Sequence, residues 1–178
     1  MFINAQGWLQ PVDIQASPNF NQRPNDNIDL VVIHNISLPM GQFGNRHIID
    51  LFCNRLDCDT HPSFASLLDI QVSAHLLIRR DGHIIQFVSF QQRAWHAGVS
   101  VYKRRDNCND YSIGIELEGT DTLAYTPVQY SQLVKVLKIM REFYPKINNR
   151  IVGHQEIAPE RKTDPGKAFD WDYLWKLL

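Results

Sequence analysis

The sequence has no apolar run long enough to cross a bilayer, so no membrane-spanning segment is expected. Its start, Met1 to Trp8, lacks a basic stretch followed by an apolar one, which argues against a secretory signal. The three cysteines, Cys53, Cys58 and Cys108, form no zinc-ribbon or CxxC pattern. These features predict a cytoplasmic protein without a disulfide framework, although Cys53 and Cys58 could pair if the chain were exported.

An excess of charge of one sign is also lacking. The formal net charge is −1, so the sequence does not indicate an electrostatic nucleic-acid binder, and we expect neither nucleic acid nor membrane as a partner. The short basic cluster Lys103–Arg105 lies beside Asp106 and Asp110 and is typical of a solvated loop, with substrate contact as the alternative. A length of 178 residues suits one domain covering residues 1–178, which we expect to be a monomer.

Familiar hydrolase motifs are missing as well. The chain contains no HExxH, the common helix-borne zinc motif, although it has seven histidines. It contains no GxSxG turn for a nucleophilic serine, and no cysteine motif supports a thiol nucleophile. A catalytic zinc site would therefore have to be assembled from separate segments, with three protein ligands and one open position.

The hydrophobic pattern predicts a mixture of strands and helices. Leu30–His34 is almost wholly apolar and is expected to be a strand covered on both faces. A helix is expected over about 45–53, and residues 54–71 are ambiguous. Ser73–Arg80 and His83–Val88 are predicted to form a hairpin in which Asp-Gly supplies the positive φ angles of a two-residue turn.

The segment Tyr111–Glu118 alternates strictly between apolar and polar residues, as a strand does. Ser112, Gly114, Glu116 and Glu118 fall on one face. An open polar face with a small residue beside a carboxylate would suit the floor of a substrate cleft. We therefore expect this face to be exposed to substrate.

Three signals predict a helix start at Thr126: a capping threonine, a proline at the first helical position, and Gln129 completing a capping box. Residues 151–153 are expected to be a short strand. Asp170 can cap a final helix whose predicted buried face holds Trp171, Leu174, Trp175 and Leu178. The predicted fold is α+β, a single mixed sheet flanked by helices.

Strand ends indicate where a metal could bind. His34 ends the buried strand at 30–34, and His154 follows Gly153 in a similar setting, so both imidazoles would be rigidly placed yet open to a cleft. Asp164 precedes Pro165, which favours an extended backbone and a stiff loop. A stiff loop suits a ligand, but from the residues alone an ordinary turn is the favoured interpretation of Asp164.

Several runs together resemble the AmpD-type 1,6-anhydro-N-acetylmuramoyl-L-alanine amidases, within the type 2 N-acetylmuramoyl-L-alanine amidase family. The resemblance covers nearly the whole chain, including its length, and implies the fold shared with peptidoglycan recognition proteins and phage amidases. The runs that carry it are 32–39, 95–100, 108–121, 153–154, 157–159, 161–166 and 169–171.

The resemblance implies that His34, His154 and Asp164 bind Zn²⁺. It also places the family's strand carboxylate at Glu116, as general base, and its near-metal lysine at Lys162, as a donor to the oxyanion. The implied reaction is hydrolysis of the amide between the lactyl group of 1,6-anhydro-N-acetylmuramic acid and L-alanine. That reaction belongs to peptidoglycan recycling, in which muropeptides released during cell-wall degradation are processed in the cytoplasm.

The assignments of the general base, the lysine and the substrate-binding residues each have an alternative. Glu118 shares the face of Glu116 and is its local rival as the base, and Lys162 could be a solvated loop lysine. Asn35, His96 and Ala97 are candidate substrate-binding residues, although a buried tryptophan beside a satisfied His96 fits that run equally well.

Three other classes of protein are rivals to a recycling amidase. A peptidoglycan-binding module without hydrolysis is disfavoured because all three candidate ligands and the carboxylate are present. An amidase acting on intact wall is disfavoured by the lack of a signal and by the chain length, although a phage enzyme needs no signal. A non-metal hydrolase has no motif to support it.

Overall fold

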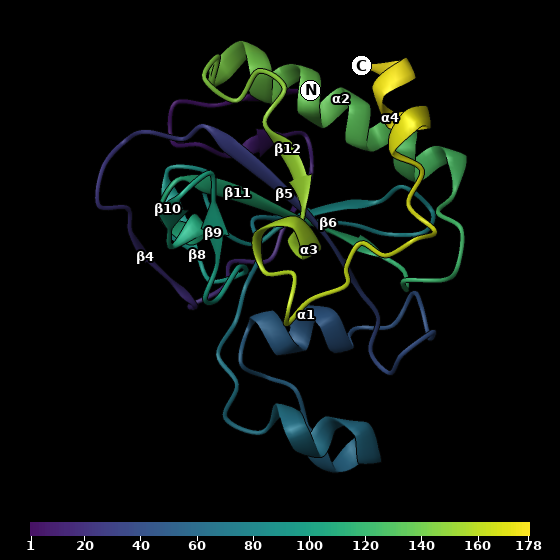
Figure 1. Cartoon of the computed structure of the whole chain (residues 1–178). Helices are drawn as coiled ribbons and strands as arrows, with labels where there is room; N and C mark the ends of the chain where they lie inside the picture. The colour runs from purple at the N-terminus through teal and green to yellow at the C-terminus, as the bar shows by residue number, and fades with distance from the viewer.

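A six-stranded mixed sheet forms the centre of the protein, whose computed structural model describes all of residues 1–178 (Figure 1). The order of its strands is β12 (Ile151–Gly153), β5 (Leu30–Ile36), β11 (Ser112–Glu118), β6 (Leu76–Ile78), β7 (Ile84–Gln86) and β3 (Asp13–Ile14). The first four run parallel, β7 is antiparallel to β6, and β3 is parallel to β7. The predicted single mixed sheet is confirmed.

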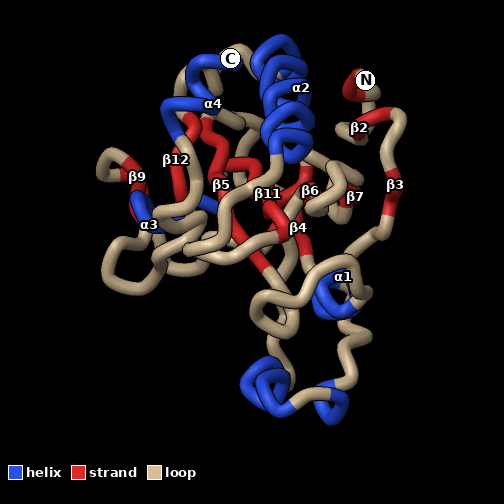
Figure 2. The backbone as a smooth tube through the Cα atoms, turned by 90° about the vertical axis from the view of Figure 1, so that its right-hand side faces the viewer, coloured by secondary structure: helices blue, strands red, loops and turns tan.

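Smaller elements surround this sheet. Three two-stranded pairs are β1 (Phe2–Ile3) with β2 (Leu9–Gln10), β4 (Phe20–Gln22) with β8 (Gln92–Ala94), and β9 (Val101–Tyr102) with β10 (Arg105–Asp106). The α-helices are α1 (His47–Phe52), α2 (Pro127–Phe143), α3 (His154–Ile157) and α4 (Trp171–Leu177). The 3₁₀-helices are η1 (Cys58–Thr60), η2 (Pro62–Leu67) and η3 (Cys108–Asp110). Thus η1 and η2 occupy the segment that the sequence left ambiguous, and they lie at the end of the molecule opposite α2 (Figure 2).

The sheet is covered on both faces. Alternate residues of β5 and β11, among them Ile33 and Ile115, join the core beneath α2 and α4. On the other face Leu30 and Val32 pack with Ile157 of α3, while α1 packs over the β6–β7 side. The first five residues of β5 are all buried, which confirms the prediction of a strand covered on both sides.

The capping box at the start of α2 is confirmed. The Thr126 hydroxyl accepts from the Gln129 N–H at 3.2 Å, and the Gln129 amide oxygen accepts from the Thr126 N–H at 3.1 Å. The Gln129 amide nitrogen also donates to the carbonyls of Ile78 and Glu118. One side chain therefore both closes the helix end and joins it to β6 and β11.

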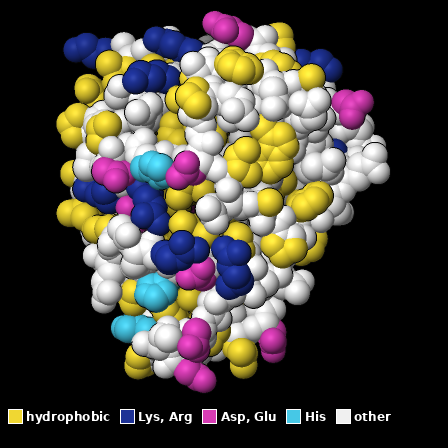
Figure 3. Space-filling model, turned by 180° about the vertical axis from the view of Figure 1, so that it is seen from behind, with side chains coloured by type: hydrophobic (Ala, Val, Ile, Leu, Met, Phe, Trp, Pro, Cys, Tyr) yellow, Lys and Arg dark blue, Asp and Glu magenta, His cyan; other side chains and the backbone are white.

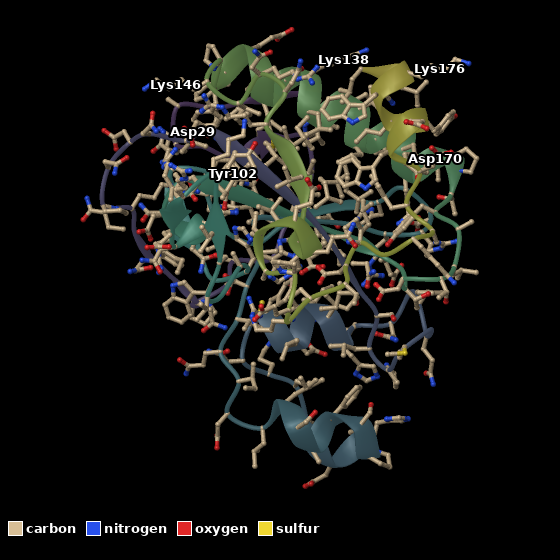
Figure 4. All side chains as sticks on the ribbon, viewed as in Figure 1. Asp29, Tyr102, Lys138, Lys146, Asp170 and Lys176 are labelled. Carbon is tan, nitrogen blue, oxygen red and sulfur yellow. The ribbon has the colours of Figure 1, made fainter.

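The final helix differs partly from its prediction. Asp170 caps α4, accepting from the Tyr173 N–H at 2.8 Å, and Lys138 of α2 donates to the Leu177 carbonyl at the other end (Figure 4). Of the predicted buried face only Leu174 is fully buried, and Trp175 is 39% exposed. Because α4 is short, fewer of its apolar side chains are buried in the core than the sequence pattern predicts.

Two other local predictions are corrected. The hairpin loop has three residues, Arg80-Asp81-Gly82, because Arg79 pairs with His83 and only Gly82 has a positive φ, +84°. This is the type I turn with a glycine bulge, in place of a two-residue turn. The polar face of β11 is also not open, since all seven residues of the strand are buried.

Charged side chains of both signs are interspersed on the face seen from behind (Figure 3). The three cysteines are free thiols. No helix of this fold combines the length and the apolar character needed to span a membrane.

Candidate metal and active site

The candidate residues meet where the parallel strands end. Glu116 of β11 is the register partner of His34 of β5, and Gly153 of β12 is the partner of Ile33. His154 follows at the first position of α3. The carboxyl ends of parallel strands are where α/β sheets place ligands, so the topology gathers side chains that are 120 residues apart in sequence.

His34, His154 and Asp164 form a tight triangle. The His34 Nδ1 atom lies 3.0 Å from His154 Nδ1 and 3.0 Å from Asp164 Oδ2, and His154 Nδ1 lies 3.1 Å from the same oxygen. Ligands about 2.0–2.2 Å from a tetrahedral zinc ion lie about 3.3 Å from one another. The three atoms are therefore spaced nearly as one face of a zinc tetrahedron, and the donor set fits the ion.

The opposite ring nitrogens are engaged elsewhere. His154 Nε2 lies 3.1 Å from the Ala97 carbonyl, which can only accept, so Nε2 carries the proton and Nδ1 keeps its lone pair for the triangle. His34 Nε2 lies 3.0 Å from His96 Nδ1. Both histidines thus turn Nδ1 towards Asp164, as two ligands of one ion would.

Burial and hydrogen bonding set the charge of the triangle. Burial lowers the pKa of His34 to about 4, although its hydrogen bond to Asp164 acts in the opposite direction. Burial alone would raise the pKa of Asp164, but the imidazoles of His154 and His34 outweigh it, because either ring donates to the carboxylate when protonated at Nδ1, and they hold that pKa below its usual value. At neutral pH a neutral His34 therefore faces a carboxylate, which suits a divalent cation.

Asp164 is fixed by the loop around it. The Gly166 N–H donates to the Thr163 carbonyl at 2.9 Å, so Asp164 does lie in a turn, as its residues suggest. The Asp164 carbonyl accepts from the Gln155 N–H at 3.0 Å, and the Pro165 carbonyl accepts from the Tyr125 hydroxyl at 2.8 Å. The turn and the ligand interpretations are therefore compatible, because the turn presents the carboxylate to both imidazoles.

The two carboxylates of β11 have different surroundings. Glu116 is 8% exposed, and its Oε2 atom has no hydrogen-bond partner. Burial and repulsion by Asp164 raise its pKa well above the usual value, with Lys162 acting in the opposite direction. Glu118 accepts from the backbone N–H groups of Gly44 and Arg80 at 2.7 and 3.1 Å. Glu118 therefore holds two loops, whereas Glu116 is available for chemistry.

A polar cleft of about 490 Å³ opens beside Asp164. Asn35 and Lys162 line it, and Asn35 donates to the Asp121 carboxylate at 2.7 Å. The other lining residues are Ile36, Ser37, Met40, Gly119, Thr120, Asp121, Thr122, Arg161 and Thr163. Of the triangle only Asp164 lines the cleft, which extends from that carboxylate along a surface able to bind hydroxyl and amide groups.

His96 and Ala97 do not line this cleft. Their backbone N–H groups both donate to Asn109 Oδ1, at 3.1 and 2.8 Å, and the Ala97 carbonyl accepts from Arg161 as well as from His154. These two residues therefore lie directly behind the triangle.

Several residues of the site were not anticipated from the sequence in these roles. Asn109 and Arg161 shape the segment behind His154, Asp121 orients Asn35, and Ser112 contacts His96. Asn109, Asp121 and Arg161 lie outside the strands and α-helices and carry no periodic signal, and the alternation that includes Ser112 does not reveal its contact with His96, so a single sequence offers no means of pairing these residues.

The family model described as N-acetylmuramoyl-L-alanine amidase (Amidase_2) matches residues 24–167. The chain is 56% identical to the 1,6-anhydro-N-acetylmuramyl-L-alanine amidase AmpD of Citrobacter freundii, covering 93% of this chain and 89% of that protein. A crystal structure of a selenomethionine AmpD derivative superposes with a TM-score of 0.97 at 54% identity, covering 100% of this chain and 99% of that one.

A more distant relative is the amidase AmiD of Escherichia coli, solved with the substrate anhydro-N-acetylmuramic acid-L-Ala-D-γ-Glu-L-Lys. It superposes with a TM-score of 0.61 at 28% identity, covering 98% of this chain and 65% of that one. The matched family region spans β5, β11, β12 and the turn at Asp164, and so contains the whole triangle. The chain therefore belongs to the Amidase_2 family of N-acetylmuramoyl-L-alanine amidases and, within it, to the AmpD type.

Proposed function

We propose that the protein is a zinc-dependent amidase that cleaves 1,6-anhydro-N-acetylmuramoyl peptides between the lactyl group and L-alanine. The observation that carries the proposal is the triangle of His34 Nδ1, His154 Nδ1 and Asp164 Oδ2, with sides of 3.0–3.1 Å. Similarity to AmpD proteins and to the AmiD–substrate complex supports the substrate class. We further propose that the protein acts as a monomer in the cytoplasm, in peptidoglycan recycling.

Three side chains would hold zinc and leave one position open, as in other catalytic zinc sites. When bound, zinc supplies a Lewis acid that polarises the amide carbonyl and makes water more acidic. The chain's own residues then have to move a proton and stabilise charge on oxygen.

Glu116 is the proposed general base. Burial and the nearby Asp164 carboxylate raise its pKa above that of an ordinary carboxylate, which makes it a stronger base towards the proton of water. It would accept the proton of the attacking water and deliver it to the leaving L-alanine nitrogen. Its Oε2 atom is free of other hydrogen bonds, so no internal contact must break first.

Lys162 is the proposed donor to the oxyanion that forms when water adds to the carbonyl. It lines the cleft two residues before Asp164, and its charge acts on both His34 and Glu116. A cation at that position would stabilise negative charge on the carbonyl oxygen. Asn35 lies on the same cleft, held by Asp121, and is proposed to contact the substrate.

His96 and Ala97 remain proposed substrate contacts from the sequence, although both lie behind the triangle. A peptidoglycan-binding module that does not hydrolyse its ligand would not need the general base, the lysine or the complete set of metal ligands. The presence of all three together favours an enzyme over such a module.

The experiment that tests the proposal is metal analysis combined with chelation. We expect about one zinc per chain, the number that one catalytic site implies, and loss of anhydro-muramoyl tripeptide cleavage on chelation that added zinc reverses. Mass spectrometry of the products identifies the bond cut. Full activity in metal-free protein would refute zinc dependence, and faster cleavage of polymeric wall would refute the recycling substrate.

A further inference from the structure

One face of β11 supports His34 from behind as well as placing Glu116 beside it. The Ser112 hydroxyl lies 3.2 Å from His96 Nε2, and His96 Nδ1 lies 3.0 Å from His34 Nε2. Between them Gly114 leaves the space that the His96 ring fills, since a Cβ atom there would overlap the ring. The small residue that the sequence placed on a cleft floor therefore makes room for a histidine.

The Cys108 carbonyl, at the far end of this series of hydrogen bonds, sets the direction of each bond. The Ser112 hydroxyl lies 2.6 Å from the Cys108 carbonyl, which can only accept, so the single hydroxyl proton points there. Ser112 must then accept from His96 Nε2–H, which leaves the His96 Nδ1 atom with a lone pair. That lone pair accepts from His34 Nε2–H, and His34 Nδ1 is left unprotonated towards Asp164.

We propose that the Cys108 carbonyl, Ser112 and His96 act together to fix His34 in the tautomer that can bind a metal through Nδ1. We call these three groups the tautomer relay. In this role His96 and Ser112 are positioning residues, because they act on the metal site through His34. This inference rests on the proposed zinc site.

The two histidines of the triangle are both held as the tautomer protonated at Nε2, but by different hydrogen-bond partners. His154 stands at a helix start and donates directly to the Ala97 carbonyl. His34 lies on β5, between β12 and β11, where the strand carbonyls nearby take part in the sheet ladder. Its ring therefore needs intermediaries to reach an acceptor, and the relay supplies them.

The first test is the tautomer of His34 in metal-free protein, read from long-range ¹H–¹⁵N NMR correlations. We expect the Nε2–H form in the wild type. In Ser112→Ala the His96 Nε2–H loses its acceptor, so His96 can change tautomer and His34 becomes a mixture of forms. Ser17→Ala is the matched control, because Ser17 is a buried serine that also bonds one carbonyl and one N–H, far from the site.

The second test is zinc affinity, measured by competition with a chromophoric chelator. Loss of the direct hydrogen-bond partner of a metal-binding histidine commonly weakens binding by about 10–100-fold, the range we expect for His96→Leu. Ser112 acts one hydrogen bond further out, so we expect Ser112→Ala to weaken zinc binding by up to about 10-fold. Ser17→Ala should bind as the wild type does. Circular dichroism and the amide NMR spectrum establish that each variant is folded.

Substitution of His96 tests the relay independently of Ser112. In His96→Asn the side-chain oxygen can take the place of Nδ1 as acceptor, whereas His96→Leu offers none. We expect His96→Asn to retain more zinc affinity and more of the Nε2–H form of His34 than His96→Leu. Equal affinities in these two variants, or an unchanged His34 tautomer in folded Ser112→Ala, would overturn the relay.

The outcomes separate this inference from the proposed function. If the wild type binds no zinc but Ser112→Ala still changes the His34 tautomer, the zinc proposal fails and the relay stands. If the wild type binds zinc and Ser112→Ala alters neither tautomer nor affinity, the zinc site stands and the relay fails.

Discussion

Glu116 and His34 are directly opposite each other on neighbouring parallel strands, so a carboxylate and an imidazole leave the same face of the sheet side by side. Because backbone hydrogen bonds fix this register, neither side chain depends on a flexible loop for its placement. The sheet itself thus sets the relation between the proposed base and the proposed metal site.

Replacing Glu116 by glutamine should abolish proton transfer while keeping the shape of the side chain. We expect kcat to fall by about 10²–10⁴, the range for loss of a general base, with zinc content unchanged. Steady-state kinetics and metal analysis on the same samples check this. Glu118→Gln is the control, since Glu118 bonds backbone groups of Gly44 and Arg80 and should affect stability far more than kcat. Loss of zinc from Glu116→Gln would mean that this residue supports the ligands.

Lys162→Ala should mainly slow the chemical step. Removal of one oxyanion donor commonly costs about 10²–10³ in kcat, and we expect KM to change much less. The matched control is Lys167→Ala, an exposed lysine on the same loop, which should leave both constants near the wild-type values. A rise in KM at constant kcat would instead identify Lys162 as a substrate-binding residue.

How far the sequence could predict this site depends on the kind of signal each residue carries. The strand at 30–34 and the helix start at Thr126 have strong local patterns. Strand β5, which carries His34, and helix α2 could therefore be predicted from the sequence. Asp164 has only the pattern of a turn, and the structure shows a turn that also presents a carboxylate. Its role required the family resemblance.

The polar face of β11 shows what a single sequence cannot supply. Alternation identified Ser112, Gly114 and Glu116 as neighbours on one face, and that arrangement is confirmed by the register. Whether the space over Gly114 is solvent or another side chain depends on a loop 18 residues away, and His96 fills it. Burial of polar residues is thus decided by long-range packing that periodicity does not record.

Loss of the capping box should destabilise the fold without affecting chemistry. Thr126→Ala removes the acceptor for the Gln129 N–H, and loss of such a cap costs about 0.5–2 kcal/mol. Urea unfolding should show this reduction, while kcat stays near that of the wild type because α2 lies on the face away from the triangle. Lys135→Ala, an exposed change in the middle of α2, should remain within about 0.5 kcal/mol. An equal loss in both variants would show that helix propensity, rather than capping, governs this helix.

The raised pKa of Glu116 predicts a pH-dependent cost to stability in metal-free protein. Its usual value is near 4.5, and burial followed by repulsion from Asp164 raises it in the folded state. Between those two values the folded chain binds more protons than the unfolded chain, so the free energy of unfolding falls as the pH rises. Glu116 therefore costs the folded state nothing at low pH, where it is protonated in both states, and the cost appears as the pH rises from the usual pKa through the raised one.

Glu116→Gln should remove this dependence, because an amide does not titrate. We expect the metal-free variant to be as stable as the wild type in acid and to be increasingly more stable than the wild type as the pH rises. The difference should reach about 1–3 kcal/mol, the cost of a buried group without a partner. Urea unfolding of both proteins in the presence of chelator, from about pH 4 to about pH 8, measures that difference directly. Because the other titrating groups are common to both chains, their contributions largely cancel. A difference that stays constant with pH would show that the Glu116 carboxylate is solvated or paired in solution, and hence that its pKa is not raised.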